Sequence, residues 1–395
     1  MRLLHVIASI DRRGGGPAAG VESLVPQYLA RGVEVDIVTL DDPRDGHGAD
    51  WPARVHALGP GRGRFGYAPR LRRWLQEHVA DYDAVIVDGL WQYHAVAAWW
   101  ALRGRSTPCF VFPHGMLDPW FKRTYPLKHF KKWWFWLLFQ GPALSAAAGV
   151  LFTTDEEKVL ARESFRPYRV REQVVGYGAC QPPAGAQQQR EAFLSRFPAL
   201  RGQRLVVFLG RIHPKKGGDL LLQGVARAAA ATQDLALVMA GPDSAGERAR
   251  LEALAVRLGI DARVHWTGML EGDLKWGALR AAEVFALPSH QENFGVAVVE
   301  ALACGVPVLV SDKVNIWREV AQDGCGIVAS DTVEGVMTQL EQWLALSADA
   351  RRAMSERACR TFESRFEIGR LAERLIGLVD AAPGGRRHAG DDDER

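Results

Sequence analysis

The hydrophobic positions of the chain form short apolar runs that alternate with longer segments of helical periodicity. The first run, RLLHVIA, precedes a segment whose apolar residues recur at i, i+3, i+4, i+7 and i+8, namely Val21, Leu24, Val25, Tyr28 and Leu29. Continuous apolar runs are typical of strands buried on both faces, and their alternation with amphipathic helices is typical of a parallel sheet. The pattern therefore predicts an α/β protein built from repeated βα units.

The same alternation runs through both halves of the chain. In the first half it predicts strands at 1–8, 33–40, 84–88, 109–113, 150–153 and 170–175, and helices at 69–78, 93–102 and 155–163. In the second half it predicts strands at 205–209, 235–240, 264–267, 283–287, 308–311 and 326–328, and helices at 218–231, 245–258, 272–281, 295–304 and within 332–379.

A stretch of linker composition separates the two halves. Residues 176–189, GYGACQPPAGAQQQ, are rich in Gly, Pro and Gln and contain few apolar side chains. Because 395 residues are too many for one small core, we expect two doubly wound, Rossmann-like domains, at 1–178 and 190–365, facing each other across a cleft. The helix at 366–383 could pack back on the first domain, and residues 384–395 are expected to be disordered.

Composition and charge narrow the class of protein. The net charge is +3 and the pI is about 8.6, which is too mild to indicate a nucleic-acid partner. The five cysteines are odd in number and widely scattered, so we expect a reducing compartment and no structural zinc. No apolar run reaches 18 residues, and the chain opens on a strand rather than a signal peptide. We therefore expect a cytoplasmic protein without a membrane-spanning helix.

The stretch from Ser289 to Pro307 carries two carboxylates around a predicted helix start. Glu292 precedes the helix and Glu300 lies inside it, about 12 Å further along if the rise is 1.5 Å per residue. This is close to the span from a nucleotide's ribose to its attached hexose. The backbone N–H groups of residues 294–296 would form an anion site at the helix N-terminus. The alternative interpretation is an ordinary capped amphipathic helix with two solvated glutamates.

Other polar residues also follow predicted strands, at the edge where open α/β sheets bind ligands. Arg211 begins RIHPKKGG, whose cations and glycines suit a diphosphate, although a solvated basic loop is the alternative. The glycines at 14–16 follow the first strand, where a flexible loop is an equal alternative. His114 follows the strand at 109–113 and could donate to a substrate, although a lone histidine is more often structural. Arg211, Lys216, the glycine loop and the Glu292/Glu300 pair all fall at the carboxyl ends of their strands, and chance would place all of them there far less often than any one of them.

The sequence Asp81-Tyr82-Asp83 matches a D-x-D pattern that many sugar-nucleotide enzymes use for a divalent metal. It precedes its strand, AVIVDG, and so falls on the amino edge of the sheet, away from the ligand crevice. We therefore predict no metal site there.

Residues 121–139, FKRTYPLKHFKKWWFWLLF, combine five cations with a Trp, Phe and Leu cluster. The apolar run is too short to span a bilayer. Its composition favours a helix that lies in the interface of an anionic membrane, with Trp133, Trp134 and Trp136 as anchors. A helix buried against the sheet and an oligomer contact are the alternatives.

The second half resembles a known family. FLGRIHPKKGGDLLLQGVA, VMAGPD, VHWTGML, VFALPSHQENFGVAVVEALACGVPVLVSD and DGCGIV resemble the successive motifs of glycosyltransferase family 4, retaining enzymes of the GT-B fold. In the first half, HVIASIDRRGGGPA resembles the family's glycine loop more loosely. PHGML resembles a subset of bacterial enzymes that build cell-surface polysaccharides. Residues 176–178, Gly-Tyr-Gly, stand where the family usually has Pro-Asn-Gly or a similar motif, which affects the expected geometry of the hinge between the domains.

The resemblance implies roles for the matching positions of the second half. Arg211 and Lys216, beside Gly210, would hold the donor diphosphate and stabilise its charge as it leaves, in place of a metal. Glu300 would accept hydrogen bonds from the ribose hydroxyls. The donor hexose would be held by Glu292 and by the backbone of Asn293, Phe294 and Gly295.

The resemblance also implies roles in the first half and a reaction. Gly15 and Gly16 would let the backbone approach the donor phosphates, and His114 would contact the sugar or orient the acceptor. The implied reaction is a retaining, front-face transfer of a hexose in which the leaving phosphate takes the acceptor's proton, without metal or cofactor. We expect a GDP- or UDP-type donor, with mannose as the first guess, and a saccharide acceptor linked to polyprenyl diphosphate. A sugar-nucleotide epimerase and a non-catalytic scaffold of a polysaccharide assembly complex remain as rival functions.

Overall fold

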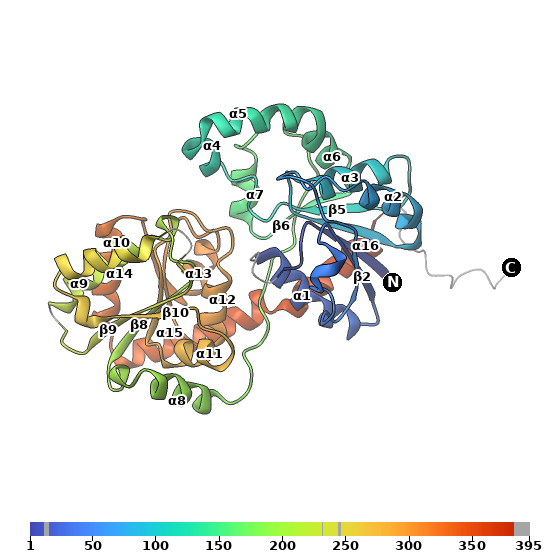
Figure 1. Cartoon of the computed structure of the whole chain (residues 1–395). Helices are drawn as coiled ribbons and strands as arrows, with labels where there is room; N and C mark the ends of the chain where they lie inside the picture. Colours follow the sequence, from blue (N-terminus) through green and yellow to red (C-terminus); the bar gives the residue numbers. More distant parts are fainter. Residues whose placement is uncertain (12–15, 231, 244–245, 383–395) are drawn as a thin grey trace. The chain divides into compact units, whose positions relative to one another are not determined.

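The computed structural model describes residues 1–11, 16–230, 232–243 and 246–382 (Figure 1). The chain forms two compact units. Unit 1 contains Met1–Gly178 together with the segment that begins at Ile368, and unit 2 contains Ala179–Glu367. Each unit is organised around its own parallel sheet.

Unit 1 contains a parallel sheet of 7 strands in the order β3-β2-β1-β4-β5-β6-β7. Its strands are β1 (Arg2–Ile7), β2 (Glu34–Thr39), β3 (Arg54–Ala57), β4 (Ala84–Asp88), β5 (Cys109–Phe112), β6 (Gly149–Phe152) and β7 (Glu172–Val174). The strand order reverses between β1 and β4, which is the topological switch point of a doubly wound sheet. The predicted fold class is confirmed for this half of the chain.

Strand β3 was not predicted, and its place in the sheet explains why. It is an edge strand of only 4 residues, RVHA, whose side chains are exposed or half-buried. An edge strand of this kind carries no continuous apolar run, so hydrophobic periodicity does not reveal it.

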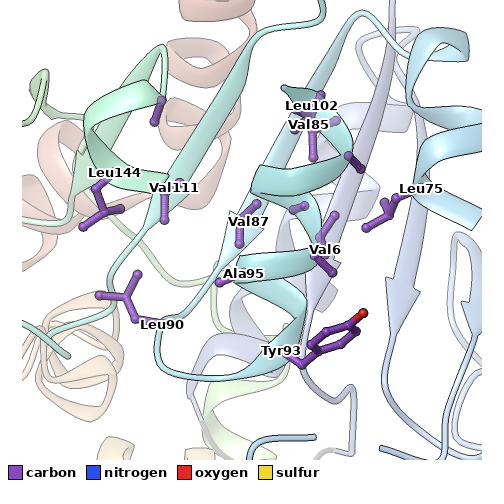
Figure 2. Packing of buried hydrophobic residues seen from close by; sticks show 14 of the residues in the cluster. Val6, Leu75, Val85, Val87, Leu90, Tyr93, Ala95, Leu102, Val111 and Leu144 are labelled. Atoms are coloured by element: carbon purple, nitrogen blue, oxygen red, sulfur yellow. The ribbon is translucent and has the colours of Figure 1, made fainter. Parts of the chain in front are cut away.

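The helices of unit 1 that connect these strands are α1 (Gly16–Leu29), α2 (Pro69–His78), α3 (Tyr93–Leu102), α4 (Trp120–Thr124), α5 (Pro126–Phe135), α6 (Gly141–Ala146) and α7 (Asp155–Ala161). A π-helical turn, Trp136–Gln140, joins α5 to α6. Most residues of α3 are buried, and Figure 2 shows its Ala95 close to Val87 of β4, in the cluster that also contains Val6 of β1. This core fixes the positions at which β1, β4 and β5 end.

The last helix, α16 (Ile368–Asp380), belongs to unit 1 although it follows unit 2 in the sequence (Figure 1). It packs against α1, where Arg31 Nη2 lies 2.8 Å from Glu373 Oε1. Arg374 Nη1 donates to the carbonyl of Val175 at 2.9 Å. The helix therefore ties the C-terminal segment to both the beginning and the end of the first half.

Unit 2 contains a parallel sheet of 6 strands in the order β10-β9-β8-β11-β12-β13, with a switch point between β8 and β11. Its strands are β8 (Arg204–Leu209), β9 (Leu235–Ala240), β10 (Val264–Gly268), β11 (Val284–Leu287), β12 (Val308–Ser311) and β13 (Gly326–Ala329). Its helices are α8 (Ala186–Arg196), α9 (Gly218–Ala229), α10 (Glu247–Arg257), α11 (Gly272–Ala281), α12 (Val296–Ala303), α13 (Trp317–Asp323), α14 (Val333–Ala345) and α15 (Ala348–Thr361). Two Rossmann-like parallel sheets in tandem are thus present, as predicted.

The stretch predicted to be a linker, 176–189, is partly helical. Helix α8 begins at Ala186 and packs on α11, where Gln189 Nε2 donates to Asp273 Oδ1 at 2.9 Å. A side chain at Gly277 of α11 would place its Cβ 2.1 Å from the Gln189 carbonyl oxygen, so glycine allows the two helices to approach closely. The Gln-rich composition therefore marks the start of a packed helix rather than a loose connection.

Candidate active site

The loops after β8 and β9 meet backbone to backbone in unit 2. Gly241 has a φ of 143°, and a Cβ at this position would lie 1.8 Å from the carbonyl oxygen of Gly210. The N–H of Ile212 donates to the Pro242 carbonyl at 2.9 Å. These contacts fix the backbone on either side of Arg211. The Arg211 side chain is exposed and forms no ion pair with a described residue.

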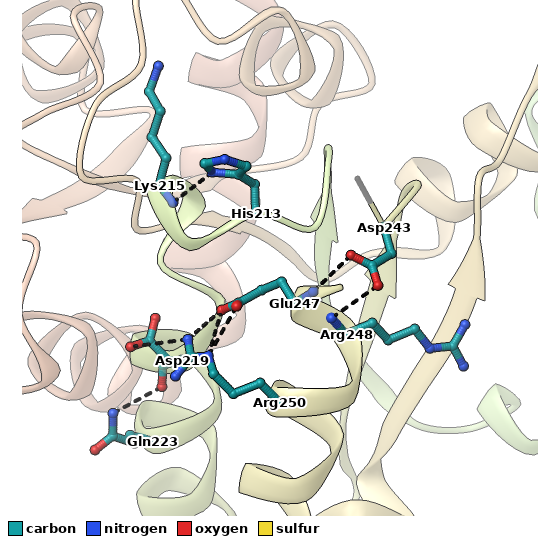
Figure 3. A network of polar contacts seen from close by, with 8 residues as sticks. All are labelled: His213, Lys215, Asp219, Gln223, Asp243, Glu247, Arg248 and Arg250. Carbon is teal, nitrogen blue, oxygen red and sulfur yellow. Dashed lines mark hydrogen bonds and ion pairs between the residues drawn. The ribbon is translucent and has the colours of Figure 1, made fainter. Parts of the chain in front are cut away.

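The next turn carries the lysines of the RIHPKKGG motif. Residues Pro214–Lys216 form a 3₁₀ turn, and the N–H of Lys215 donates to Nδ1 of His213 at 3.1 Å (Figure 3). The turn ends at Gly217, whose φ is 68° and whose Cβ, if present, would lie 2.1 Å from the carbonyl oxygen of Pro288. Glycine is therefore required for this turn to press against the end of β11.

Lys216 forms an ion pair with Glu292, and both side chains are largely buried. The backbone of Glu292 is held on both sides, because its N–H donates to the Lys313 carbonyl at 2.9 Å and its carbonyl accepts from the N–H of Asn315 at 3.0 Å. The residue thus has a fixed position between the loops that follow β11 and β12. Sequence analysis assigned Lys216 and Glu292 to one donor site, and the structure brings them together.

The residues between Glu292 and α12 shape the start of that helix. Phe294 is buried, with its ring edge-on to Phe366 at 5.7 Å between centroids. Asn293 Oδ1 accepts a long hydrogen bond from Asn315 Nδ2 at 3.4 Å. Gly295 has a φ of 80° and directly precedes the first helical residue, Val296. The turn therefore places the first N–H groups of α12 beside Glu292, where a helix N-terminus favours an anion.

Glu300 of α12 is paired with Lys275 of α11, at 2.8 Å between Oε1 and Nζ. The Lys275 ammonium also lies 4.3 Å from the centre of the Trp276 ring. Sequence analysis missed Lys275, because a single lysine within a helix carries no motif. In this structure the carboxylate expected to bind a ribose therefore has a cation beside it, which orients it.

A second polar network supports the helices behind the lysine turn. Figure 3 shows Arg250 of α10 between Glu247 and Asp219, the latter at the start of α9. The Asp243 carboxylate accepts from the N–H of Glu247 at 3.0 Å. These pairs link α9 to α10, so the helix that follows Gly217 has a fixed position under the turn.

In unit 1 the histidine after β5 belongs to a buried carboxylate network. Nε2 of His114 lies 3.0 Å from Oδ1 of Asp88, and Nδ1 of His5 lies 2.8 Å from Oδ2 of the same carboxylate. Burial alone would raise the pKa of Asp88, but the two histidines outweigh it and hold that pKa at about 2. Because an ionised carboxylate only accepts, His114 donates through Nε2 and keeps Nδ1 for another partner.

The backbone at His114 is held in an uncommon conformation. Its φ is 49°, and the N–H of the following Gly115 donates to Oε1 of the buried Glu157 at 2.6 Å. The other Glu157 oxygen accepts from the N–H and Oγ1 of Thr153, at 2.8 and 2.7 Å. Burial raises the pKa of Glu157. Uncommon non-glycine backbone of this kind clusters at functional sites.

Tyr177, in the Gly-Tyr-Gly segment, packs beside this histidine. Its ring lies edge-on to His114 at 5.9 Å between centroids. Its hydroxyl occupies the space that a side chain at Gly20 would take, 1.5 Å from the ideal Cβ position. Where this chain departs from the family's motif, it therefore packs an aromatic ring against His114.

A cavity of about 400 Å³ lies at the carboxyl ends of β1, β2 and β4 in unit 1. Asp88, Asp41 and Gln92 are among its lining residues. Gly16 begins α1 nearby, and a Cβ there would meet nothing within 4 Å, so unit 1 itself does not require glycine at this position. The predicted role of Gly15 lies outside the described residues.

Three of the network residues were missed by sequence analysis. His5 and Asp88 lie within buried apolar strands, RLLHVI and AVIVD, and a polar side chain in such a strand is a signal that could have marked them. Glu157 follows the helix cap Thr154 and reads as an ordinary first-turn acid. Asp83, of the D-x-D pattern, accepts from the N–H of Arg2 at 2.7 Å, which places it at the amino edge as predicted.

Comparison with known proteins links both units to sugar transfer. Residues 190–361 match the family model of glycosyl transferases group 1, and residues 15–178 match that of the glycosyl transferase 4-like domain. A D-inositol 3-phosphate glycosyltransferase of Segniliparus rotundus is 33% identical over 191 residues, covering 46% of this chain and 40% of the relative. That of Mycolicibacterium gilvum is 39% identical over 137 residues, covering 34% and 28%. The matches thus span two fifths or less of these curated relatives.

Solved structures share the fold at low sequence identity. Sucrose-phosphate synthase from Thermosynechococcus elongatus has a TM-score of 0.74 at 19% identity, covering 96% of this chain and 98% of that one. Anabaena Alr3699/HepE, in complex with UDP and glucose, has a TM-score of 0.75 at 16% identity, covering 96% and 99%. With both halves matched by family models and two Rossmann-like sheets in the family's order, this chain belongs to the glycosyltransferases of family 4, with the GT-B fold.

Proposed function

We propose that the protein transfers a hexose, with retention of configuration, from a nucleoside-diphosphate sugar to a saccharide acceptor. The observation that carries the proposal is the contact between Lys216 and Glu292 just before α12, with Arg211 on the loop that leads from β8 to the lysine turn. The group combines cations for a diphosphate, a helix N-terminus that favours anions and a carboxylate for sugar hydroxyls. A capped structural helix needs none of these.

On donor binding, the diphosphate takes Lys216 away from Glu292. Arg211 is paired with no carboxylate of the described residues and adds a second cation. Glu292, released from its lysine, accepts from the hexose hydroxyls, and Glu300 accepts from the ribose while Lys275 orients its carboxylate. The cations also stabilise the charge that develops on the leaving phosphate, the task a metal performs in other transferases.

The nucleotide of the donor is of UDP or GDP type. The HepE structure, which contains UDP and glucose, supports a nucleoside-diphosphate hexose for this fold. Mannose is the hexose we propose first. The acceptor hydroxyl attacks the anomeric carbon from the face of the leaving group, and the departing phosphate oxygen takes its proton. His114, oriented by Asp88, contacts the sugar or the acceptor through Nδ1.

We also propose that the acceptor is lipid-linked and that α5 lies on an anionic membrane surface, in a protein that is otherwise cytoplasmic. The support is an exposed apolar stripe at helical spacing, formed by Leu127, Phe130, Trp134 and Leu138. Lys128 and Lys131, also exposed, lie on the same helix. No helix in the described ranges is long and apolar enough to cross a bilayer.

The membrane anchors differ from those expected. Trp134 is 53% exposed, whereas Trp136 is 1% exposed and belongs to the core, with its Nε1 donating to the Pro167 carbonyl at 2.9 Å. Trp133 Nε1 donates to the Arg166 carbonyl at 3.1 Å. The prediction that all three tryptophans are membrane anchors is therefore wrong for Trp136, because residues two positions apart lie on opposite sides of a helix, so that Trp136 faces the core when Trp134 faces solvent.

The donor proposal is tested by thermal shift against UDP-, GDP- and ADP-sugars, each with and without a chelator. Stabilisation by sugars of one nucleotide, unchanged by the chelator and lost in both Lys216→Ala and Glu300→Ala, supports it. Stabilisation that survives both substitutions places the donor elsewhere. A protein that no donor stabilises would fit the non-catalytic scaffold instead.

A further inference from the structure

Helices α4 and α5 enclose a small cavity on unit 1. Its volume is about 70 Å³, and its walls include Trp91, Tyr125, Lys128, His129, Lys132 and Phe165. A water molecule occupies about 30 Å³ in the liquid, so the cavity suits one small group rather than a sugar ring. The walls are therefore aromatic and basic at once, which the fold alone does not require.

The two lysines of this cavity lie over aromatic rings and are not paired with a carboxylate of the described residues. Nζ of Lys132 lies 4.5 Å from the centre of the Trp91 ring, and Nζ of Lys128 lies 4.6 Å from that of Tyr125. Neither forms an ion pair with any described residue. Burial lowers the pKa of Lys132, so its charge is partly desolvated without a counter-ion. A cation in this state gains more from an incoming anion than a solvated one does.

The third basic group is a histidine pressed against the same wall. His129 stacks on Phe165 with 4.3 Å between ring centroids. Burial, and then the charges of Lys122 and Lys132, lower the pKa of His129. The one carboxylate among the lining residues, Asp118, is engaged at Oδ1 by the N–H of Trp120 at 2.7 Å. Positive charge therefore dominates the cavity, and an anion would relieve its repulsion.

The cavity is adjacent to the candidate active site. Trp91 has a φ of 71°, and its ring is held by a hydrogen bond of 3.3 Å from Nε1 to the Met116 carbonyl. Met116, two residues after His114, lines both this cavity and the cavity of about 400 Å³ that contains Asp88. Met116 therefore forms part of the wall of both cavities, and the two residues with uncommon backbone, Trp91 and His114, lie next to it. Such backbone clusters at functional sites.

We propose that this cavity binds a phosphate group of the acceptor, held by Lys128 and Lys132 with Trp91 and Tyr125 as walls. The inference rests on the proposed transferase function and specifies the chemistry of its acceptor. The phosphate belongs either to a lipid-linked acceptor or to a soluble phosphorylated sugar. Both present the same oxyanion to the two lysines.

The test measures binding of inorganic phosphate in the Lys216→Ala background, where the donor site is disabled, by isothermal titration calorimetry. Replacing Lys128 and Lys132 together by Gln is expected to weaken phosphate binding by about tenfold or more. Lys131→Gln removes a charge from the same helix outside the cavity and is expected to leave binding unchanged. Lys132→Arg keeps the charge and is expected to retain binding. Equal phosphate binding by the Lys128→Gln/Lys132→Gln protein overturns the proposal.

A second arm identifies the source of the phosphate. Phosphatidylcholine vesicles with and without farnesyl phosphate are titrated with the same variants. If farnesyl phosphate raises the affinity for vesicles, and this gain is lost in the Lys128→Gln/Lys132→Gln protein, the acceptor is lipid-linked. If farnesyl phosphate does not raise the affinity for vesicles while inorganic phosphate still binds, the acceptor is soluble. Neither binding measurement needs a donor. A cavity that binds no phosphate and a protein that transfers no sugar therefore give different results. Thermal unfolding of each variant confirms that it is folded.

Discussion

Lys216 and Glu292 form an ion pair across 76 positions of the sequence, and the sequence pattern predicts both for the same donor site. The pair joins the turn after β8 to the loop before α12. In a protein without donor it neutralises a cation and an anion that would each be costly to leave alone. Donor binding must therefore replace this contact. Experiments with variants can then distinguish the role of Lys216 from that of Glu292.

The two members of the pair should affect different parts of the donor. Lys216→Ala is expected to weaken both the nucleoside diphosphate and its sugar conjugate by at least tenfold, because the diphosphate loses a charged hydrogen bond. Glu292→Gln is expected to weaken only the sugar conjugate. Titration calorimetry with each ligand checks this, with Lys313→Ala, an exposed lysine on the neighbouring loop, as control. Equal loss of both ligands in Glu292→Gln would contradict the assignment.

The lysine turn depends on a glycine for space as well as for conformation. Gly217 and Gly259 both have a φ of 68°, but a Cβ would lie 2.1 Å from a carbonyl oxygen at Gly217 and meet nothing within 4 Å at Gly259. Gly259→Ala is expected to cost about 1 kcal/mol of stability and to bind donor normally. Gly217→Ala should cost more stability and abolish donor binding, because the added methyl group forces the lysine turn away from the Pro288 carbonyl. Thermal unfolding and donor titration of both variants measure this; matching behaviour would show that the close approach is unimportant.

The Asp88 network predicts a loss of stability in acid. The pKa of Asp88 is lowered from 3.8 to about 2, so the folded state favours the ionised carboxylate. This contribution, about 2 kcal/mol, is fully present above pH 4 and is lost as the pH falls from about 4 to about 2. The difference in free energy of unfolding between wild type and Asp88→Asn should therefore narrow over that range.

Urea unfolding at a series of pH values measures the difference. Asp45→Asn, at an exposed position of the same unit, controls for the loss of one surface charge. If the difference in free energy of unfolding between wild type and Asp88→Asn stays constant from pH 5 to pH 2, the ionised network is ruled out.

The apolar stripe of α5 predicts membrane binding. Replacing Leu127, Trp134 and Leu138 by Ser should lower partitioning to phosphatidylglycerol vesicles at least tenfold, since it removes the exposed apolar area that would enter the interface. Val256→Ser/Met269→Ser removes exposed apolar side chains from unit 2 and should have no effect. Vesicle flotation measures both proteins. If the α5 variant floats with the vesicles as well as wild type does, the stripe does not bind the membrane and another partner must contact it.

The fold was predictable because buried strands such as β4 and β9 are continuous apolar runs, and the helices between them keep their period. The positions of Glu292 and Glu300 followed from the strand–helix order around them. The partner of Glu300 did not follow, because Lys275 reaches Glu300 from another helix and the contact depends on how α11 packs. The burial of Trp136 was missed because the WWFWLLF run is apolar all round, so its composition does not indicate which tryptophan faces the core.

The claim that unit 2 holds a sugar-transferring donor site is tested most directly by the release of nucleoside diphosphate. The donor that stabilises the protein is incubated with a bacterial membrane extract as the source of acceptor. We predict release by wild type and by Lys313→Ala, and a rate about 100-fold lower for Lys216→Ala, as expected when a group that stabilises developing charge is removed. Release by Lys216→Ala at the wild-type rate, or none by wild type with any donor, would contradict the account.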